Sequence, residues 1–203
     1  MPAPTQGHPL EDELLLRTLR LNTQTGAYAL LWRKLYSPAW ETDNWAAISR
    51  WPTTTPPLTQ GVGPTWTRDT PLRTEFARRA ALVQIDALVA VRLGISEDEL
   101  VAMYNARFPV LQHYEENLWF DAAGRRIAKA HHQHGYGQPK DAWKALSSQE
   151  GYPETVDELP GYDGPLYPAD RRSEMRAAHK EFTRRLRAAG WEPGGATGPS
   201  ADD

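Results

Sequence analysis

The chain has 203 residues, of which 40% are hydrophobic and 10% aromatic, a composition typical of a globular protein with its own core. It has no cysteine, so disulfides, thiolate zinc sites and cysteine nucleophiles are excluded. The formal net charge is −3, so any contact with nucleic acid would have to use a local basic face. The first residues lack the pattern of a signal peptide, and no apolar stretch approaches the roughly 18 residues of a membrane span. We therefore expect a cytoplasmic chain without a membrane partner.

The first ordered element is expected to begin near residue 10, after a disordered segment of residues 1–9. Apolar residues recur at helical spacings on one face: Leu10, Leu14, Leu21, Tyr28, Leu31 and Leu35. Poor helix formers from Asn22 to Gly26 interrupt the pattern. One long helix with a weak centre and two short helices both fit. Pro38 ends the element in either case, because proline has no amide hydrogen to donate.

The next segment, from Pro38 to Pro71, is rich in proline and tryptophan, and we name it the Trp/Pro segment. Its tryptophans are Trp40, Trp45, Trp51 and Trp66. A flexible linker would be poor in tryptophan, so we expect an ordered, irregular segment whose indoles pack on the helices. The alternative is that some of these rings stack on unpaired bases. No cluster of lysine or arginine accompanies them, which favours packing.

The strongest helical pattern runs from Thr70 to Leu93, with Thr70 as the expected N-cap and Pro71 in the first helical position. The body of this helix is apolar around most of its circumference, which predicts a central place in the core. Gly94 is expected to end it. Ser96 and Glu99 then form a capping-box pattern that begins a second helix through about residue 105. The two helices together predict a helical hairpin.

The C-terminal part of the chain predicts a small β-hairpin at 118–127, with its turn at 121–124. A short helix is expected at 140–146 and a longer one at 169–189, which Gly190 would cap. Residues 191–203 are expected to form a disordered tail. The predicted fold is therefore mainly α with a small β-hairpin, as a single irregular helical domain at 10–190 that contains the Trp/Pro segment.

The terminal helix is the most basic part of the chain. Between residues 169 and 189 it carries seven cations against three carboxylates, a local excess of four. The cations are Arg171, Arg172, Arg176, Lys180, Arg184, Arg185 and Arg187. Such a face can neutralise phosphates and release their counterions. An ordinary solvated face with charged neighbours three and four residues apart is the alternative, and charge alone favours it.

The sequence contains none of the common motifs of catalysis or cofactor binding. Phosphate loops, nucleophile elbows, paired metalloprotease histidines and calcium loops are absent. His131, His132 and His134 could support a metal enzyme, but three ligands within four residues cannot easily surround one tetrahedral ion. We expect a polar loop there. The sequence predicts no catalytic residue, no metal site and no cofactor.

One set of segments resembles a known family as a whole. The resemblance is carried by Leu19-Arg-Leu-Asn through Ala39-Trp40, Val62-Gly-Pro-Thr-Trp, Thr70-Pro-Leu-Arg, Arg79-Ala-Ala-Leu-Val-Gln-Ile-Asp-Ala-Leu-Val-Ala, Leu93-Gly-Ile-Ser-Glu-Asp-Glu-Leu, Tyr104-Asn-Ala-Arg-Phe-Pro-Val-Leu, Tyr114 and Trp119-Phe-Asp-Ala-Ala-Gly-Arg-Arg. These segments, over about residues 14 to 145, resemble the C-terminal accessory region of large actinobacterial-type restriction–modification DNA adenine methyltransferases. They are packing motifs, not catalytic signatures.

The resemblance implies a non-catalytic role in a restriction–modification, phage-defence system. The Asn-Pro-Pro-Tyr-type motif and the S-adenosylmethionine loop of such enzymes are absent, so no catalytic residue is carried over. One hypothesis is a DNA-associated accessory domain with duplex DNA as partner. Its expected phosphate contacts are Arg125, Arg126 and Lys129 beside the hairpin turn, and, on charge alone, Arg171, Arg172, Arg176, Lys180 and Arg184. The other hypothesis is a protein-interaction module that docks on a separate methyltransferase catalytic subunit without touching DNA.

Overall fold

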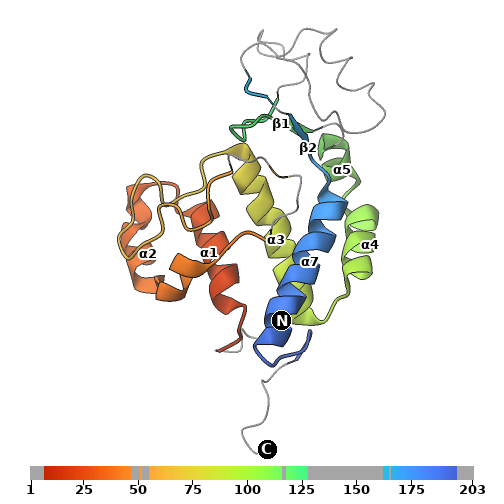
Figure 1. Ribbon diagram of the computed structural model, residues 1–203, viewed down its shortest axis with the longest axis horizontal. Helices are drawn as coiled ribbons and strands as arrows, with labels where there is room; N and C mark the ends of the chain where they lie inside the picture. Colours follow the sequence, from red (N-terminus) through yellow and green to blue (C-terminus); the bar gives the residue numbers. More distant parts are fainter. Residues whose placement is uncertain are drawn as a thin grey trace, which may run out of the picture.

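A computed structural model of the protein describes residues 7–46, 51, 55–115, 118–127, 162–164 and 166–195. These residues form a mainly helical fold with a small two-stranded antiparallel sheet, which confirms the predicted fold class (Figure 1). Helix α7 lies along the central helix α3, with α1 and α2 on one side and α4 and α5 on the other (Figure 1). The sheet covers one end of this arrangement.

The N-terminal element is two short helices, the second of the alternatives that the sequence left open. Helix α1 spans Glu11–Asn22, a 3-10 turn η1 follows at Gly26–Tyr28, and α2 spans Ala29–Leu35. Helix α1 ends at Thr23, whose backbone leaves the helical conformation at φ −81 and ψ +54 and whose hydroxyl donates to the Leu19 carbonyl. This interruption resets the helical phase, so Tyr28 and Leu31 are exposed instead of continuing the predicted apolar face.

The central helix α3 spans Glu75–Leu93 and begins later than predicted. Thr70 is not its N-cap, because the Thr70 hydroxyl is buried and bonds to the loop atoms Thr67 N and Gly61 O. Thr74 is the cap instead, and its hydroxyl accepts from Ala77 N at 3.2 Å. Pro71 therefore lies in the preceding loop.

The turn after α3 follows the prediction. Gly94 has φ +71, a left-handed conformation that ends the helix without strain for a residue lacking Cβ. Helix α4 then spans Glu97–Arg107, and both reciprocal bonds of the Ser96–Glu99 capping box are present. Helix α5 at Pro109–Glu115 was not predicted.

The sheet pairs β1 at Trp119–Phe120 with β2 at Tyr167–Pro168. The predicted turn at 121–124 is present, and Phe120 makes an isolated bridge to Arg126. The strand partner of β1, however, comes from a distant segment. The turn packs against the start of α3, because Gly124 O accepts from Phe76 N at 3.1 Å. The sheet is thereby fixed to the central helix.

The last helix, α7, spans Arg171–Ala188, close to the predicted range. Its apolar face carries Met175, Phe182 and Leu186, which are buried against α3 and α4. Residues 191–195, expected to begin the tail, are among the described residues. Trp191 packs against this core, and Gly194 N donates to Val91 O at 3.1 Å. His8, from the expected N-terminal tail, is buried against the Trp191 ring.

The Trp/Pro segment forms a second core with α1 and α2, as predicted, and includes the 3-10 helix η2 at Pro38–Thr42. Trp40 is fully buried, and its indole N–H donates to Asp12 Oδ1 at 2.8 Å. Trp45, Trp51, Phe76 and Phe120 make successive edge-to-face contacts 5.2 to 5.7 Å apart. Because the Trp40 ring is fully buried, it is unavailable for stacking on unpaired bases. The short helix expected at 140–146 lies outside the described residues.

Candidate functional site

Side chains at the N-terminal end of the basic helix α7 form hydrogen bonds and ion pairs with neighbouring helices. The Arg171 guanidinium contacts the Asp86 carboxylate at 2.7 Å and that of Glu115 at 2.9 Å, and only 9% of its side chain is exposed. Arg172 donates to Asn105 Oδ1 at 2.8 Å and to Gln112 Oε1 at 3.1 Å. Both arginines are engaged within the fold.

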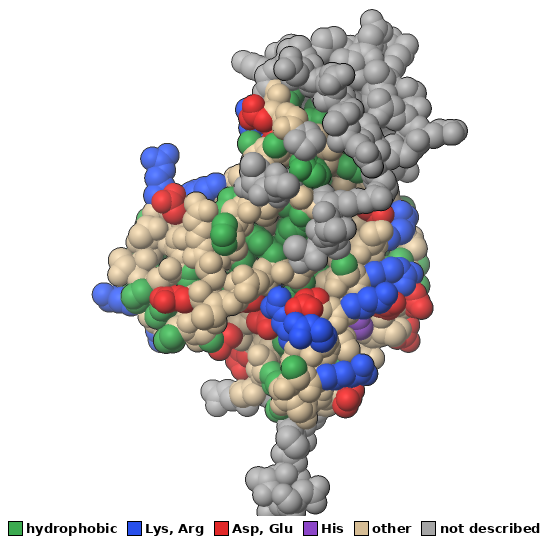
Figure 2. All heavy atoms as spheres, in the orientation of Figure 1, with side chains coloured by type: hydrophobic (Ala, Val, Ile, Leu, Met, Phe, Trp, Pro, Cys, Tyr) green, Lys and Arg blue, Asp and Glu red, His purple; other side chains and the backbone are tan. Residues whose placement is uncertain are grey.

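The predicted cations further along α7 also have carboxylate partners. Arg176 pairs with Asp98, and Lys180 lies 3.6 Å from Glu97 on the neighbouring α4. Arg184 makes two 2.8 Å bonds to the carboxylate of Glu181. Figure 2 accordingly shows positive and negative side chains intermingled over α7 rather than a continuous basic surface.

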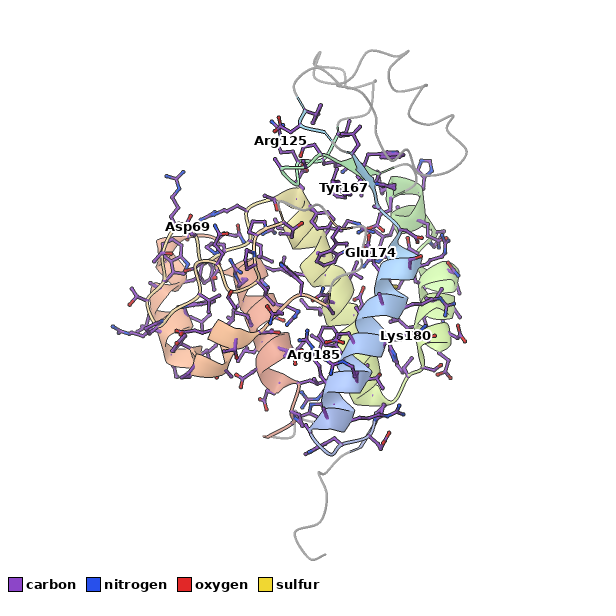
Figure 3. All side chains as sticks on the ribbon, viewed as in Figure 1. Asp69, Arg125, Tyr167, Glu174, Lys180 and Arg185 are labelled. Atoms are coloured by element: carbon purple, nitrogen blue, oxygen red, sulfur yellow. The ribbon has the colours of Figure 1, made fainter. Side chains whose placement is uncertain are left out.

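The cations at the hairpin turn lie apart from α7 (Figure 3). Arg125 contacts the Asp121 carboxylate at 2.6 Å and that of Asp163 at 3.0 Å, and these hydrogen bonds and charges raise the pKa of its guanidinium. Arg126 is exposed, and its backbone N–H donates to Glu75 Oε2 at 2.9 Å. Lys129 lies outside the described residues. The structure therefore brings together only part of the predicted phosphate-binding set.

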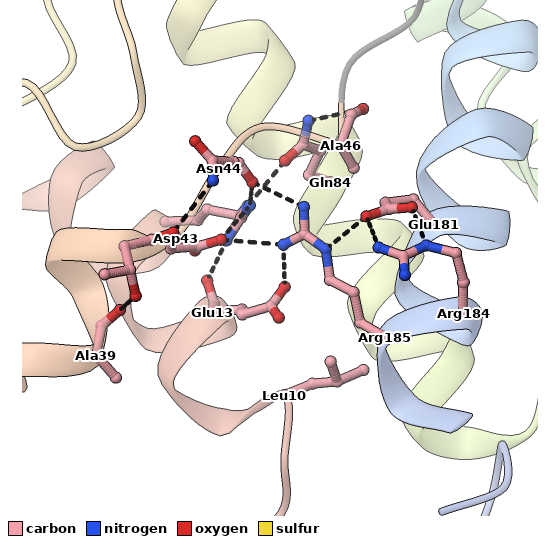
Figure 4. Close-up of polar contacts among 12 residues, drawn as sticks. Leu10, Glu13, Ala39, Asp43, Asn44, Ala46, Gln84, Glu181, Arg184 and Arg185 are labelled. Atoms are coloured by element: carbon pink, nitrogen blue, oxygen red, sulfur yellow. Dashed lines mark hydrogen bonds and ion pairs between the residues drawn. The ribbon is translucent and has the colours of Figure 1, made fainter. Parts of the chain in front are cut away.

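A charged network joins α1, the Trp/Pro segment and α7 (Figure 4). Arg17 is fully buried, and all of its guanidinium N–H groups have acceptors, including Asp43 Oδ2 at 2.5 Å and Gln84 Oε1 at 2.8 Å. Arg185 of α7 reaches the same Asp43 at 3.0 Å and Glu13 at 2.9 Å. Burial lowers the pKa of Arg17, while burial and the nearby Asp43 raise the pKa of Glu13. The network binds the N-terminal half of the chain to the terminal helix.

This network lines a polar cleft of about 540 Å³ between α1, η2 and α7. The charged residues around it are Asp12, Glu13, Asp43, Glu181, Arg184 and Arg185. Their charged groups bond to one another or, for Asp12, to the Trp40 indole. These ion pairs join α1, the Trp/Pro segment and α7, an arrangement that suits a structural role.

Glu181 provides a test of the network by pH. Its bonds to Arg184 and the neighbouring Arg185 lower its pKa from 4.5 to about 2. A carboxyl group with a lowered folded-state pKa stabilises the fold above its unfolded pKa and loses that contribution as the pH falls. Urea unfolding should therefore show that the difference in stability between wild type and Glu181→Gln, at most about 1 kcal/mol for this partly exposed group, disappears between pH 4.5 and 2. A pH-independent difference would contradict this.

An apolar groove of about 370 Å³ lies between α3, α4 and α5, away from the charged network. Its rim carries the exposed side chains of Val89, Leu93, Met103 and Phe108. The sequence showed that this helix is apolar around most of its circumference and predicted a central place for it in the core. The exposure of Val89 and Leu93 on α3 was therefore not predicted. The sequence feature that could have indicated it is the large number of apolar positions on this helix.

Among the described residues, no group of histidine, aspartate or glutamate side chains is arranged to hold a metal ion. The histidine cluster at 131–134 lies outside that part of the chain. No helix within the described ranges is long and apolar enough to cross a membrane.

Comparison with known proteins adds no assignment. The chain matches no family model, no curated protein and no solved structure. The function has to be inferred from the charged faces, the groove and the sequence resemblance together.

Proposed function

We propose that this domain is a non-catalytic accessory module of a restriction–modification DNA methyltransferase and that it works by docking on the catalytic part of that system. The observation that carries the choice of protein over DNA is the contrast between two surfaces. The cations of α7 are bonded within the chain, whereas large apolar side chains around the α3–α5 groove face solvent. A contiguous exposed apolar patch is typical of a surface that contacts another protein.

The charges favour protein contact for a second reason. Affinity for duplex DNA comes mainly from cations that release counterions when they neutralise phosphates. Arg171, Arg176 and Arg184 already neutralise carboxylates of the same chain, so binding a phosphate would break an existing ion pair. The net charge of −3 adds repulsion at longer range. DNA contact through Arg126 and its neighbours stays a prediction that no observation tests.

We propose a non-catalytic role because of the bonds that the polar side chains of the cleft make. In the polar cleft, which is larger than the apolar groove, the carboxylates of Glu13, Asp43 and Glu181 are each bonded to arginine. Carboxylates held by arginine in this way stabilise the fold, and we assign them a structural role. The methyl transfer would thus belong to the partner.

The direct test is complex formation with a methyltransferase of the resembled kind from which its own C-terminal region has been removed. We expect the purified chain and the truncated enzyme to co-elute in size-exclusion chromatography with light scattering at one-to-one mass. Fluorescence anisotropy with a labelled DNA duplex across a salt series is the parallel measurement. We expect no salt-dependent binding by the isolated chain.

The two expectations, complex formation and the lack of DNA binding, can fail separately. Salt-sensitive DNA binding that is lost in Arg125→Ala/Arg126→Ala would support the DNA-associated alternative instead. Failure to co-elute, with the chain folded by circular dichroism, would overturn the docking proposal.

A further inference from the structure

The central helix α3 has an apolar stripe that no described element covers. Leu82, Val89 and Leu93 are 50%, 39% and 53% exposed. They are seven and four residues apart, which places them on one face of the helix. This is the spacing that one helix presents to another along a packed seam.

Val89 and Leu93 of this stripe form one wall of the α3–α5 groove. Met103 of α4 and Phe108 before α5 form the opposite wall and are also about half exposed. Buried side chains of Ala90, Leu100 and Met175 form the floor. A trough walled by two helices and floored by apolar side chains accommodates a third helix by ridges-into-grooves packing.

One edge of the groove carries an incompletely neutralised carboxylate. Asp86 lies on α3 between Leu82 and Val89, and its side chain is 43% exposed. Its Oδ2 binds Arg171 at 2.7 Å, whereas Oδ1 has no partner among the described residues.

The ion-pair cluster that contains Asp86 has more carboxylates than cations. The connected ion pairs comprise two cations and three carboxylates, giving a net charge of −1: Arg79, Arg171, Asp86, Glu115 and Glu174. Burial and the nearby Glu115 raise the pKa of Asp86, against the opposing effect of Arg171. A cation supplied from outside would complete this cluster.

We propose that the groove binds an amphipathic helix of the partner protein, with apolar side chains at i, i+4 and i+7 and a lysine or arginine opposite Asp86. This deepens the docking function proposed above and rests on it for the identity of the partner. The apolar face would cover Val89, Leu93 and Met103, and the cation would bind the open carboxylate oxygen of Asp86.

The first experiment replaces groove residues that face solvent, so that the fold is retained. Val89→Glu and Met103→Glu place a charge in the groove, and Leu30→Glu is the matched control on α2, where Leu30 is 67% exposed. Thermal unfolding followed by circular dichroism checks each variant. Binding to the truncated methyltransferase should weaken at least about tenfold for the two groove variants and stay unchanged for Leu30→Glu.

The second experiment uses a defined probe that does not depend on the methyltransferase. Two fluorescein-labelled peptides of roughly 18 residues, about 27 Å as a helix, carry leucines at the stated spacing and differ only in lysine or glutamate at the position facing Asp86. Wild type should prefer the lysine peptide about tenfold. Asp86→Asn keeps an oxygen for Arg171 and should abolish this preference, an effect that a purely structural role of Asp86 would not produce.

The outcomes separate the groove from the proposed function. If the groove variants bind the methyltransferase as tightly as wild type does, the groove is not the docking site, but the proposed function stands. If the chain prefers the lysine peptide through the groove but does not bind the methyltransferase, the groove is a helix-binding site and the methyltransferase is not its partner. A wild-type dimer that the groove variants convert to monomer identifies a second copy as occupant and overturns the partner helix. Equal binding of both peptides overturns the role of Asp86.

Discussion

Replacing Arg20 with methionine is expected to lower the free energy of unfolding by about 3–5 kcal/mol. Arg20 is buried in α1, and its guanidinium donates to four backbone carbonyls of the Trp/Pro segment, those of Leu58, Gln60, Asp69 and Thr70. Methionine fills much of the same volume but leaves these carbonyls without their donor. Urea unfolding at neutral pH measures the loss, and the unfolding midpoint should fall in proportion if the m-value is unchanged.

Two further variants separate the roles of charge and geometry. Arg20→Lys retains the cation, but an ammonium group cannot reproduce the planar fork that reaches four carbonyls, so we expect an intermediate loss. Arg33→Met, which makes the same exchange at an exposed position of α2, should change stability by no more than about 0.5 kcal/mol. Equal midpoints for Arg20→Met and Arg33→Met would show that the four carbonyl bonds contribute nothing to stability. Burial lowers the pKa of Arg20 to about 10, so the group remains charged in this assay.

Local signals predicted several parts of the fold well. Gly94 and the Ser96–Glu99 box are determined by short-range backbone geometry, and both occur where the sequence placed them. The apolar pattern of α7 likewise located that helix to within two residues, because its buried face repeats at helical spacing. Features of this kind depend on neighbours a few residues away, which the sequence displays directly.

The errors occur where a distant segment decides the structure. Thr70 has the chemistry of an N-cap, but its hydroxyl bonds to the loop at Gly61 and Thr67 instead. The strand partner of β1 comes from residues 167–168, and no local pattern could identify it. Arg17 and Arg20 look like solvated helix positions, yet both are buried because remote carbonyls and Asp43 accept their N–H groups.

The candidate site shows the same limit. The excess of positive charge on α7 was correctly counted, but its partners Asp86, Glu97 and Asp98 belong to other helices. A count over one segment cannot reveal this neutralisation. The groove was equally hidden, since the sequence shows that α3 is apolar but not which of its faces remains uncovered. Both corrections favour a protein partner over DNA.

The second large effect is expected at Asp43, which holds the N-terminal half of the chain to α7. Asp43→Ala should lower the free energy of unfolding by about 3–5 kcal/mol, because it leaves the fully buried Arg17 without a carboxylate and removes one partner of Arg185. The loss should persist at high salt, since counterions screen a buried pair poorly. Urea unfolding at low and high salt measures both effects.

The neighbouring residue supplies the control for this prediction. The Asn44 side chain is exposed and donates to Thr42 O, so Asn44→Ala should cost no more than about 0.5 kcal/mol. Asp43→Asn retains an acceptor without the charge and should fall between the two. If Asp43→Asn were as stable as wild type, the negative charge would be irrelevant and hydrogen bonding and packing alone would join the halves. If Asp43→Ala lost stability only at low salt, the ion pairs would act as surface charges, in conflict with the burial of Arg17.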